Sequence, residues 1–448
     1  MIVSKFGGTS VATAQKISNL CQITKKSLAK DPVIVVSAVA GVTDLLSEIP
    51  ENPNNAKSKI ERIRKIHYDL ISNLFKNTQS NEIKNYINQE LADLSKHTRK
   101  KIYDKSEIDK ILAFGEIMSS HIIAKALESS GIPARQIVAS DVIVTNDNFG
   151  SADFLPAPTK KKTKKVLLPI IKEKIVPVVT GFIGTSKNGK LTTLGRGGSD
   201  YTAAIIGFSL NAKEIEIWTD VDGIFTTDPK VAPKAKLIRQ ISYKEASELA
   251  AFGAKVLHPR TIKPAIKAGI AVRVLNTQDP NCQGTLICDK PDLKNPITAI
   301  SFKRKITLIN IYSTEMLFKK GFLAKIFKVF AKYNISIDLV SVSEVTVSVT
   351  LENHDHLAKA LDELSKFSSV SANTNYGMIS LIGEGIVTSS ETIKKIFDIL
   401  DERKILVKMI SLGASDINVG LVLQYNRIEE AVNVLHNKLL IKNLNNAK

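Results

Sequence analysis

Short apolar segments that run directly into turns of glycine and other small residues recur along this chain, and they constrain its fold most strongly. MIVSKF (1–6) leads into Gly7-Gly8-Thr9-Ser10, and helical periodicity follows over residues 11–30. An apolar strand at 33–37 is again followed by small residues, up to Gly41, and by a helix. Strands that alternate with helices predict an α/β sandwich with a largely parallel sheet, whose ligands bind at the carboxyl ends of the strands.

The middle of the chain interrupts this alternation. Residues 52–110 are polar, rich in Lys and Asn and free of strand signals, so we expect exposed helices inserted into the α/β unit, as a lid or a partner surface. The alternation resumes with a helix over about 115–130 and with the strands PARQIVAS, IVPVVTGFIG and EIEIWTD. Because 448 residues are too many for one ordinary domain, we expect a first domain over 1–294 and a second over 295–448.

The last third of the chain contains an internal repeat of the βαββαβ type, the ferredoxin-like unit. One copy spans about 306–375. The second spans 376–440 and lacks its last strand, which the spare strand at 297–302 would supply, so we predict two interlaced units. The expected strands are 297–302, 306–313, 335–343, 345–351, 368–374, 376–383, 405–411 and 417–423, and the expected helices are 321–333, 355–366, 390–402 and 427–439.

Composition excludes several classes of protein. The net charge of +18 would suit nucleic acid, a membrane surface or small anionic substrates. Lysines are spread along the whole chain, however, and the few aromatic residues are not interleaved with basic ones, which argues against nucleic acid. The run TKKKTKK (159–165) is interpreted as the start of a solvated helix. The chain has no apolar run long enough for a signal peptide or a membrane span, and its three cysteines match no zinc spacing, so we expect a cytoplasmic protein without a metal site.

Two glycine-rich turns carry charged residues that suit a bound anion. KFGGTS places Lys5 beside a glycine pair and two hydroxyls, and GRGGSD places Arg196 and Asp200 around another glycine pair. One such turn is weak evidence, because every α/β protein needs tight turns. Backbone N–H groups at a helix start together with a lysine charge nevertheless form a phosphate cradle, so the two turns predict an anion site.

At this point the chain resembles a known family. KFGGTS, SAVAGVT, FGE, TTLGRGGSDYTAA, WTDVDGI, TTDP and FGAKVLHP are similar to the signature segments of aspartate kinases in the amino-acid kinase superfamily. The paired ferredoxin-like units resemble the ACT regulatory domains of that family, and GFLAKIF and NISIDLVSVSEVTVSVTL most resemble its lysine-sensitive, single-function branch. The resemblance covers essentially the whole chain and implies a three-layer α/β/α kinase domain followed by two ACT units.

The implied reaction is transfer of the γ-phosphoryl group of ATP, with Mg²⁺, to the side-chain carboxylate of L-aspartate, the first step towards lysine, threonine and methionine. A carboxylate is already a nucleophile at neutral pH, so the protein must chiefly position two anions and neutralise charge. Two alternatives stay open. Another amino-acid kinase, such as an acetylglutamate or glutamate kinase, should lack this tail, and a decayed, non-catalytic amino-acid sensor would have no reason to retain Lys5, Glu116, Arg196 and Asp200.

The resemblance assigns catalytic roles to Lys5, which would stabilise the transferring phosphoryl group, and to Asp200, which would organise the site. Lys5 could instead be a solvated strand-end lysine, and Ser199 or Asp200 could simply cap a helix. The planar fork of Arg196 suits the substrate carboxylate. Glu116 would bind the substrate ammonium, although an acid at a helix start is also favoured by the helix dipole. The other substrate-binding candidates are Ser37, Thr43, Gly197 and Ser199.

WTDVDGIFTTDPK resembles the segment that binds adenine and ribose in the family. Phe225 stands where many relatives have Tyr, and Lys230 where Arg is common, so we expect a shift in ATP affinity and unchanged chemistry. His258 is interpreted as structural, because the reaction needs no base there. The ATP-binding candidates are Lys5, Gly7, Gly8, Thr219, Asp220, Phe225, Asp228, Lys230 and Lys255.

Positions in the tail resemble the lysine-binding site of the sensitive branch: Met316, Gly321, Phe322, Leu323, Asp338, Ser343 and Glu344. An ammonium ligand needs acids, and Asp338 and Glu344 supply them, whereas Phe322 and Leu323 could equally be core residues. Lys319 and Val342 depart from the family pattern, so the sequence leaves open whether lysine, threonine or neither inhibits. ACT units commonly pair across subunits, and we therefore predict a homodimer or a dimer of dimers with an amino-acid effector, lysine in the first place.

Overall fold

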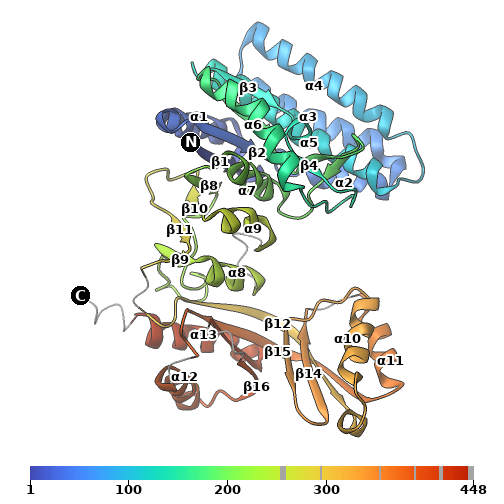
Figure 1. Cartoon of the computed structure of the whole chain (residues 1–448), viewed down its shortest axis with the longest axis vertical. Helices are drawn as coiled ribbons and strands as arrows, with labels where there is room; N and C mark the ends of the chain where they lie inside the picture. The colour runs from blue at the N-terminus through green and yellow to red at the C-terminus, as the bar shows by residue number, and fades with distance from the viewer. Residues whose placement is uncertain (253–258, 293–294, 353–354, 388–389, 413–416, 442–448) are drawn as a thin grey trace. The chain divides into compact units, whose positions relative to one another are not determined.

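The computed structural model describes residues 1–252, 259–292, 295–352, 355–387, 390–412 and 417–441. Contacts within the chain divide it into two compact units. The first comprises residues 1–224 and 256–291, and the second comprises residues 225–255 and 292–448 (Figure 1). Within the described ranges, no helix is both long and apolar enough to cross a membrane.

A mostly parallel sheet lies at the centre of the first unit. Its strands in this unit follow the order β3-β5-β2-β1-β8-β10-β11, and the neighbouring pairs are parallel except β10 with β11. The strands are β1 (Ile2–Phe6), β2 (Pro32–Val36), β3 (Ala134–Ile137), β5 (Val176–Thr180), β8 (Glu214–Thr219), β10 (Ala271–Asn276) and β11 (Thr285–Cys288). Every residue of β2 and β5 is buried, as expected for parallel strands covered on both faces.

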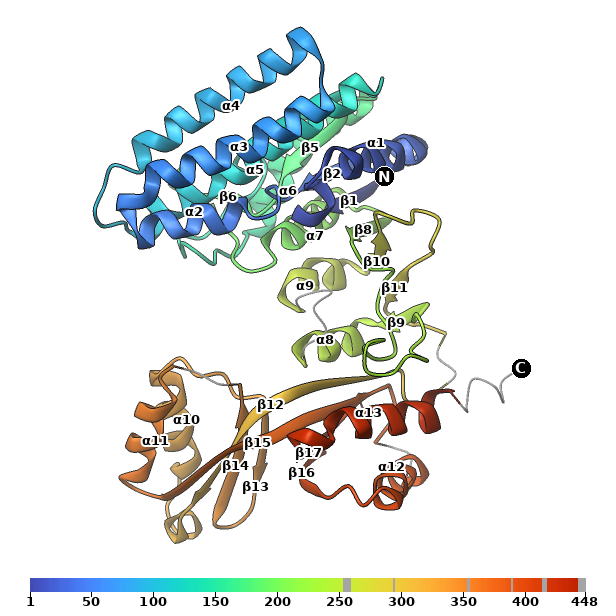
Figure 2. The same ribbon diagram turned by 180° about the vertical axis from the view of Figure 1, so that it is seen from behind.

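Helices cover both faces of this sheet (Figure 2). On one face, Phe6, Ile34 and Trp218 pack in one core with side chains of α1 (Ala14–Ser27) and α5 (Lys105–Ser129). On the other face lie α6 (Pro156–Lys172), α7 (Gly198–Leu210) and α9 (Pro259–Ala268). The three-layer α/β/α arrangement implied by the sequence is therefore confirmed.

The helices between residues 42 and 129 differ from the expectation. After α2 (Val42–Glu51), the inserted helices α3 (Ala56–Leu74) and α4 (Asn77–His97) lie side by side and bury an isoleucine and leucine stripe in the same core as the sheet. Helices are present here as expected, but they are not exposed on all sides, because this stripe packs inward while most Lys and Asn residues face outward. Helix α5 also begins well before position 115, at Lys105, where Asp104 and Glu107 form a capping box.

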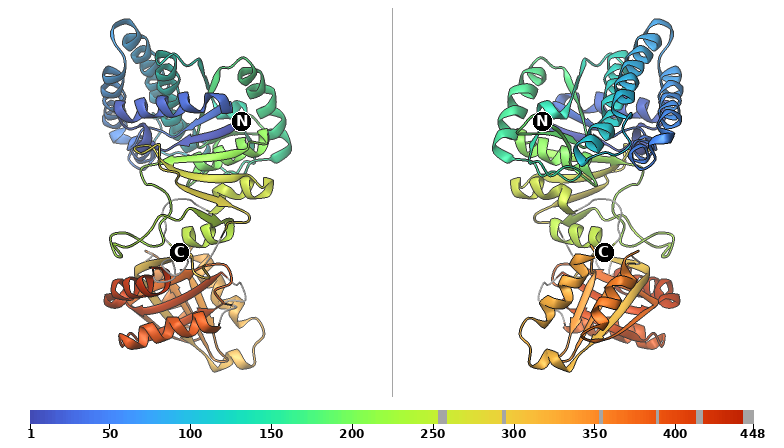
Figure 3. Two further views of the ribbon diagram at one scale, coloured as in Figure 1. Left: turned by 90° about the vertical axis from the view of Figure 1, so that its left-hand side faces the viewer. Right: turned by 90° about the vertical axis from the view of Figure 1, so that its right-hand side faces the viewer.

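The second unit contains an antiparallel sheet (Figure 3). Its six strands follow the order β13-β14-β12-β15-β17-β16. Helices α10 and α11 pack on Ile309 and Ile311, and α12 and α13 pack on Ile300 and Ile379. The strands are β12 (Ala299–Tyr312), β13 (Leu339–Val342), β14 (Thr346–Leu351), β15 (Ser369–Ile382), β16 (Val407–Leu412) and β17 (Asn418–Gln424). The helices are α10 (Phe322–Lys332), α11 (Leu357–Ser365), α12 (Ser390–Glu402) and α13 (Ile428–His436).

Two long strands replace four of the expected ones. β12 runs through most of the expected strands 297–302 and 306–313, and β15 through most of 368–374 and 376–383. The chain does not break between them, because register shifts between Lys303 and Leu308 absorb the irregularity within a continuous ladder. The start of β12 pairs with the end of β15 and its end with the start of β15, so each of these two strands contributes one part to each half of the sheet.

The segment 225–252 belongs to the second unit. The two units are therefore not divided at one boundary after residue 294, as the sequence led us to expect. The segment's helix α8 (Tyr243–Ala251) is held on the six-stranded sheet by Glu245, which accepts hydrogen bonds from Thr298 Oγ1 (2.6 Å) and from the backbone N–H of Glu384 (3.1 Å). Ser301 Oγ also donates to the carbonyl oxygen of Phe252 (2.7 Å). These contacts join residues far apart in the sequence, so the local pattern of the chain did not indicate them.

Candidate active site

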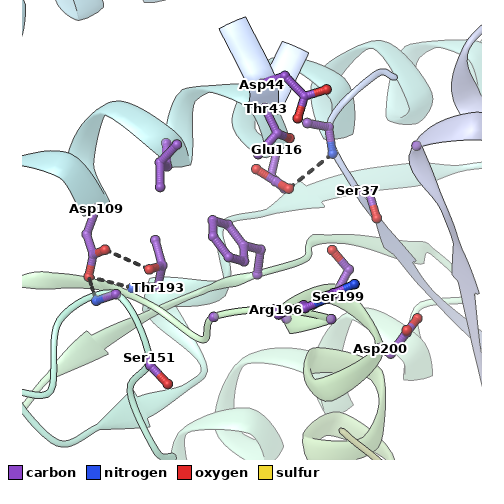
Figure 4. A pocket seen from close by; sticks show the side chains of 18 of the residues that line it. Ser37, Thr43, Asp44, Asp109, Glu116, Ser151, Thr193, Arg196, Ser199 and Asp200 are labelled. Carbon is purple, nitrogen blue, oxygen red and sulfur yellow. Dashed lines mark hydrogen bonds between the residues drawn. The ribbon is translucent and has the colours of Figure 1, made fainter. Parts of the chain in front are cut away.

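A cavity of about 840 Å³ opens at the carboxyl ends of β1 and β2 (Figure 4). This is the edge at which parallel α/β sheets bind ligands. The catalytic and substrate-binding candidates of the sequence all line it: Lys5, Ser37, Thr43, Glu116, Arg196, Gly197, Ser199 and Asp200, together with the ATP candidate Gly8. The structure therefore brings residues from four separate segments into one cavity.

Lys5 and Asp200 form an ion pair at the base of this group. Lys5 Nζ lies 2.7 Å from Asp200 Oδ1, and the two side chains are only 12% and 15% exposed. Lys5 is thus not a solvated strand-end lysine. Helix α7 is capped by Gly197 in the left-handed conformation (φ 70°), so Ser199 and Asp200 lie within its first turn and do not cap it. The unsatisfied N–H groups of that first turn add a positive potential next to Lys5.

Close approach of the turns explains one of the glycines. A Cβ atom on Gly8 would lie 2.8 Å from the carbonyl oxygen of Ala38, so a side chain there would separate the turn after β1 from the turn after β2. The backbone N–H of Ser37 donates to the carbonyl oxygen of Phe6 (3.1 Å), which continues the pairing of the two strands up to the cavity. The turns can therefore present several backbone groups to one ligand.

Glu116 is a buried acid with unused hydrogen-bonding capacity. Its side chain is 3% exposed, and Oε1 accepts a hydrogen bond from the backbone N–H of Ala38 (3.2 Å). Oε2 has no partner in the described part of the chain. Burial raises the pKa of Glu116 to about 8. Since α5 begins at Lys105, Glu116 lies in mid-helix and not at a helix start, so the dipole does not explain this acid; a bound cation would.

Sequence reasoning missed several residues that line the cavity. Asp109 is fully buried and, like Glu116, lies on α5; seven residues are two helical turns, so both acids share one face. An acid within the apolar run IDKILAF was a signal that could have identified it. Phe182 adopts φ 69°, and its ring lies where a Cβ on Gly198 would be only 2.5 Å away. The further lining residues missed include Asp44, Asn148, Phe149, Gly150, Ser151 and Thr193.

The structure describes the remaining ATP candidates only locally. In the first unit, Gly7 precedes the turn of Gly8, and Thr219 Oγ1 donates to Asp220 Oδ1 (3.2 Å). In the second unit, Phe225 forms a bridge with Leu237, and Asp228 accepts from the backbone N–H of Lys230 (2.9 Å), which stabilises its own turn. Lys255 and His258 lie outside the described residues. A nucleotide site made from these segments stays a prediction.

The candidate effector residues fall into two groups. Met316 and Phe322 pack in the core beneath α10 and α11, Gly321 caps α10 with φ 84°, and Leu323 is 39% exposed. Asp338 is half-buried and paired with Lys303 Nζ at 2.7 Å; its other oxygen, Oδ2, has no hydrogen-bond partner among the described residues. Burial raises the pKa of Asp338, which the Lys303 ammonium partly opposes.

Ser343 and Glu344 lie away from Asp338, in the exposed turn between β13 and β14. At about 3.3 Å per residue of strand, Ser343 is roughly 16 Å from Asp338 along β13. The two predicted acidic positions, Asp338 and Glu344, therefore lie at opposite ends of β13 in one copy of the chain.

Comparisons with known proteins agree with this geometry. The family profile described as the amino acid kinase family matches residues 1–276, and that of the ACT domain matches residues 379–439. The chain is 36% identical over 451 residues to lysine-sensitive aspartokinase 3 of Escherichia coli, covering 98% of this chain and 99% of that relative. The chain belongs to the aspartokinase family. The resemblance inferred from the motifs is confirmed, and the protein is an aspartate kinase.

Solved aspartokinases have the same fold. The crystal structure of E. coli aspartokinase III in complex with aspartate and ADP (R-state) matches with a TM-score of 0.84 at 35% identity, covering 98% of this chain and 99% of that one. The structure of the same enzyme with lysine and aspartate (T-state) matches with a TM-score of 0.87 and the same coverage. Aspartokinase 1, chloroplastic, of Arabidopsis thaliana is 37% identical and covers 97% of this chain, which spans 79% of that relative.

Proposed function

We propose that this enzyme phosphorylates the side-chain carboxylate of L-aspartate with ATP, giving 4-phospho-L-aspartate and ADP. The observation that carries the proposal is the Lys5–Asp200 ion pair in the same cavity as the unpartnered Oε2 of Glu116. A carboxylate oxygen of aspartate attacks the γ-phosphorus, the bond from that phosphorus to the β–γ bridging oxygen breaks, and ADP leaves with the electron pair. No proton is transferred, so the enzyme contributes position and charge.

Each end of aspartate has a partner in the cavity. Glu116, buried and with one free oxygen, suits the ammonium group. Arg196, on the turn before α7, offers a planar fork for a carboxylate. Ser37, Thr43 and Ser199 supply hydroxyl groups around them, and Gly197 brings the start of α7 close. The similarity to E. coli aspartokinase III, which was solved in complex with aspartate and ADP, supports aspartate as the ligand.

We propose that ATP binds as its Mg²⁺ complex. The described residues include no group of three or more His, Cys, Asp or Glu placed to hold a metal. Mg²⁺ commonly keeps several waters and binds one or two carboxylates plus phosphates, and Asp200 provides a carboxylate of that kind beside Lys5. Bound Mg²⁺ would supply neutralisation of phosphate charge. Lys5, Gly7 and Gly8 would hold the phosphates, and the nucleotide would be held by Thr219, Asp220, Phe225, Asp228, Lys230 and Lys255.

We propose that lysine is the feedback effector and that the enzyme is a homodimer or a dimer of dimers. The solved complex of E. coli aspartokinase III with lysine supports the ligand. The separation of Asp338 from Glu344 supports an effector site that two copies share. The edge strand β13 exposes Val340 and Val342, a surface suited to pairing with a second copy. The enzyme would then control the first step towards lysine, threonine and methionine in the cytoplasm.

The function is tested by phosphoryl transfer with Mg-ATP, trapping the acyl phosphate with hydroxylamine. We expect turnover with L-aspartate, little with glutamate or N-acetylglutamate, and suppression by lysine in preference to threonine. Turnover with N-acetylglutamate in place of aspartate would identify another amino-acid kinase. Saturable lysine binding without any turnover would instead favour a non-catalytic amino-acid sensor.

The proposed dimer predicts that Val342→Asp weakens self-association and inhibition together. We expect the unchanged chain to sediment as a dimer or larger at low micromolar concentration, and the variant to shift towards the monomer with at least about a tenfold weaker response to lysine. Ile102→Asp is the matched control, since Ile102 is also exposed (87%) but lies in the first unit. A variant that sediments as a monomer yet keeps full lysine inhibition would contradict the shared site.

A further inference from the structure

We infer that Asp109 is a positioning residue of the aspartate site, whose buried carboxylate ties two loops of the cavity wall together and so sets the position of Arg196. The inference rests on the proposed role of Arg196 in binding aspartate. Asp109 lies on α5, is fully buried and lines the cavity, yet the proposed phosphoryl transfer does not use it.

Both oxygens of Asp109 are occupied by donors from two loops (Figure 4). Oδ1 accepts a hydrogen bond from Thr193 Oγ1 (2.6 Å), and Oδ2 accepts from the backbone N–H groups of Thr193 (2.8 Å) and Gly150 (3.0 Å). An ionised carboxylate accepts such bonds on both oxygens, and bonds to a charged acceptor are stronger than neutral ones. Since three donors occupy the two oxygens, Asp109 positions the loops and does not bind substrate itself.

The two loops are packed against each other with little freedom. Thr193 ends β7 (Leu191–Thr193), three residues before Arg196, and its carbonyl oxygen accepts from the backbone N–H of Ala152 (2.9 Å). A Cβ atom on Gly195 would lie 3.2 Å from the carbonyl oxygen of Gly150. The place of the Gly150 loop therefore determines the path of the chain that leads to Arg196.

Arg260 of α9 holds the Gly150 loop from another direction. Its guanidinium donates to Ser151 Oγ (2.6 Å), to the carbonyl oxygen of Ser151 (3.1 Å) and to Asp153 Oδ1 (2.7 Å). The loop thus has an acidic anchor on α5 and a basic anchor on α9. Loss of the Asp109 contacts would free Thr193 and Gly150, and with them the chain that leads to Arg196, while the Arg260 contacts persist. We therefore expect a local shift of the substrate site and not unfolding.

The test compares Thr193→Val with Thr192→Val. Both remove a buried hydroxyl from β7, but Thr192 Oγ1 pairs with Thr145 Oγ1 (2.8 Å) and does not line the cavity. We expect Thr193→Val to raise KM for aspartate about tenfold, with KM for ATP and kcat within about twofold, since one bond to a charged group is lost. Thr193→Ser, which keeps the hydroxyl, should restore KM for aspartate to the value of the unchanged enzyme. Asp109→Asn should raise KM for aspartate more than Thr193→Val does.

Arg196→Lys tests whether the effect passes through Arg196. We expect the double variant Thr193→Val/Arg196→Lys to raise KM for aspartate no further than Arg196→Lys alone. Equal KM values for Thr193→Val and Thr192→Val would overturn the inference, as would parallel rises in both KM values or additive effects with Arg196→Lys. If Asp109→Asn does not fold, the threonine variants still decide. Absence of aspartate turnover in the unchanged enzyme would overturn the proposed function instead.

Discussion

Lys5→Ala is expected to lower kcat about a thousandfold while KM for aspartate stays within about twofold. The Lys5 ammonium lies at the carboxyl end of β1, mostly shielded from solvent, where charge on the transferring phosphoryl group would be neutralised. Shielding makes the interaction stronger than in water. The effect on kcat alone is expected because the interaction grows as negative charge moves in the transition state. Steady-state kinetics with each substrate varied in turn would measure it.

Two controls separate this role from a structural one. Arg273→Met breaks the partly buried Arg273–Glu214 pair of the same unit, away from the cavity, and should lower stability without lowering kcat. Lys5→Ala/Asp200→Asn removes both partners of the other pair. If Lys5 only balanced the charge of Asp200, this double variant would recover activity. Recovery, or near-normal kcat in Lys5→Ala, would contradict the catalytic assignment.

Glu116→Gln is expected to raise KM for aspartate about a hundredfold and to abolish its pH dependence. With a pKa of about 8, Glu116 is mostly protonated in the free enzyme at neutral pH. The substrate ammonium favours the carboxylate, so binding releases a proton. In the unchanged enzyme, KM for aspartate should therefore fall by up to about tenfold per pH unit between pH 6 and 7 and level off above pH 8.

The same residue makes a prediction for stability. The folded pKa of Glu116 lies above its ordinary value of 4.5, so between these values the folded state holds a proton that the unfolded state has lost. The contribution of Glu116 to stability is thus full below pH 4.5 and declines as pH rises to 8. Thermal unfolding should show Glu116→Gln gaining stability over the unchanged enzyme as pH rises over this range.

The exposed Glu61 of α3 provides a comparison, and Glu61→Gln should change neither KM nor the pH profile. If KM for aspartate in Glu116→Gln still falls towards pH 8 as in the unchanged enzyme, the pH dependence of KM arises from another group. A stability difference that does not grow with pH would show that Glu116 is not held protonated in the fold.

Much of the kinase site followed from residues close together in the sequence. Lys5, Gly7 and Gly8 are close together in the sequence, as are Arg196, Gly197, Ser199 and Asp200, so the two motifs by themselves predicted an anion site at these positions. The sequence did not indicate the role of Asp109, because its hydrogen-bond partners Thr193 and Gly150 lie 84 and 41 residues away along the chain. Glu116 was found through its motif, but its buried, unpartnered oxygen was not foreseen, because burial depends on what packs around α5.

The sequence by itself determined the alternation of strands and helices, the glycine turns and the repeated order of the tail, because side-chain periodicity and turn chemistry act between near neighbours. Only the tertiary structure decided that β12 and β15 run through both repeats, that Glu245 places α8 on the six-stranded sheet, and that Asp109 joins two loops of the cavity. These features depend on hydrogen bonds and burial between distant segments, and their energies exist only once those segments have packed together.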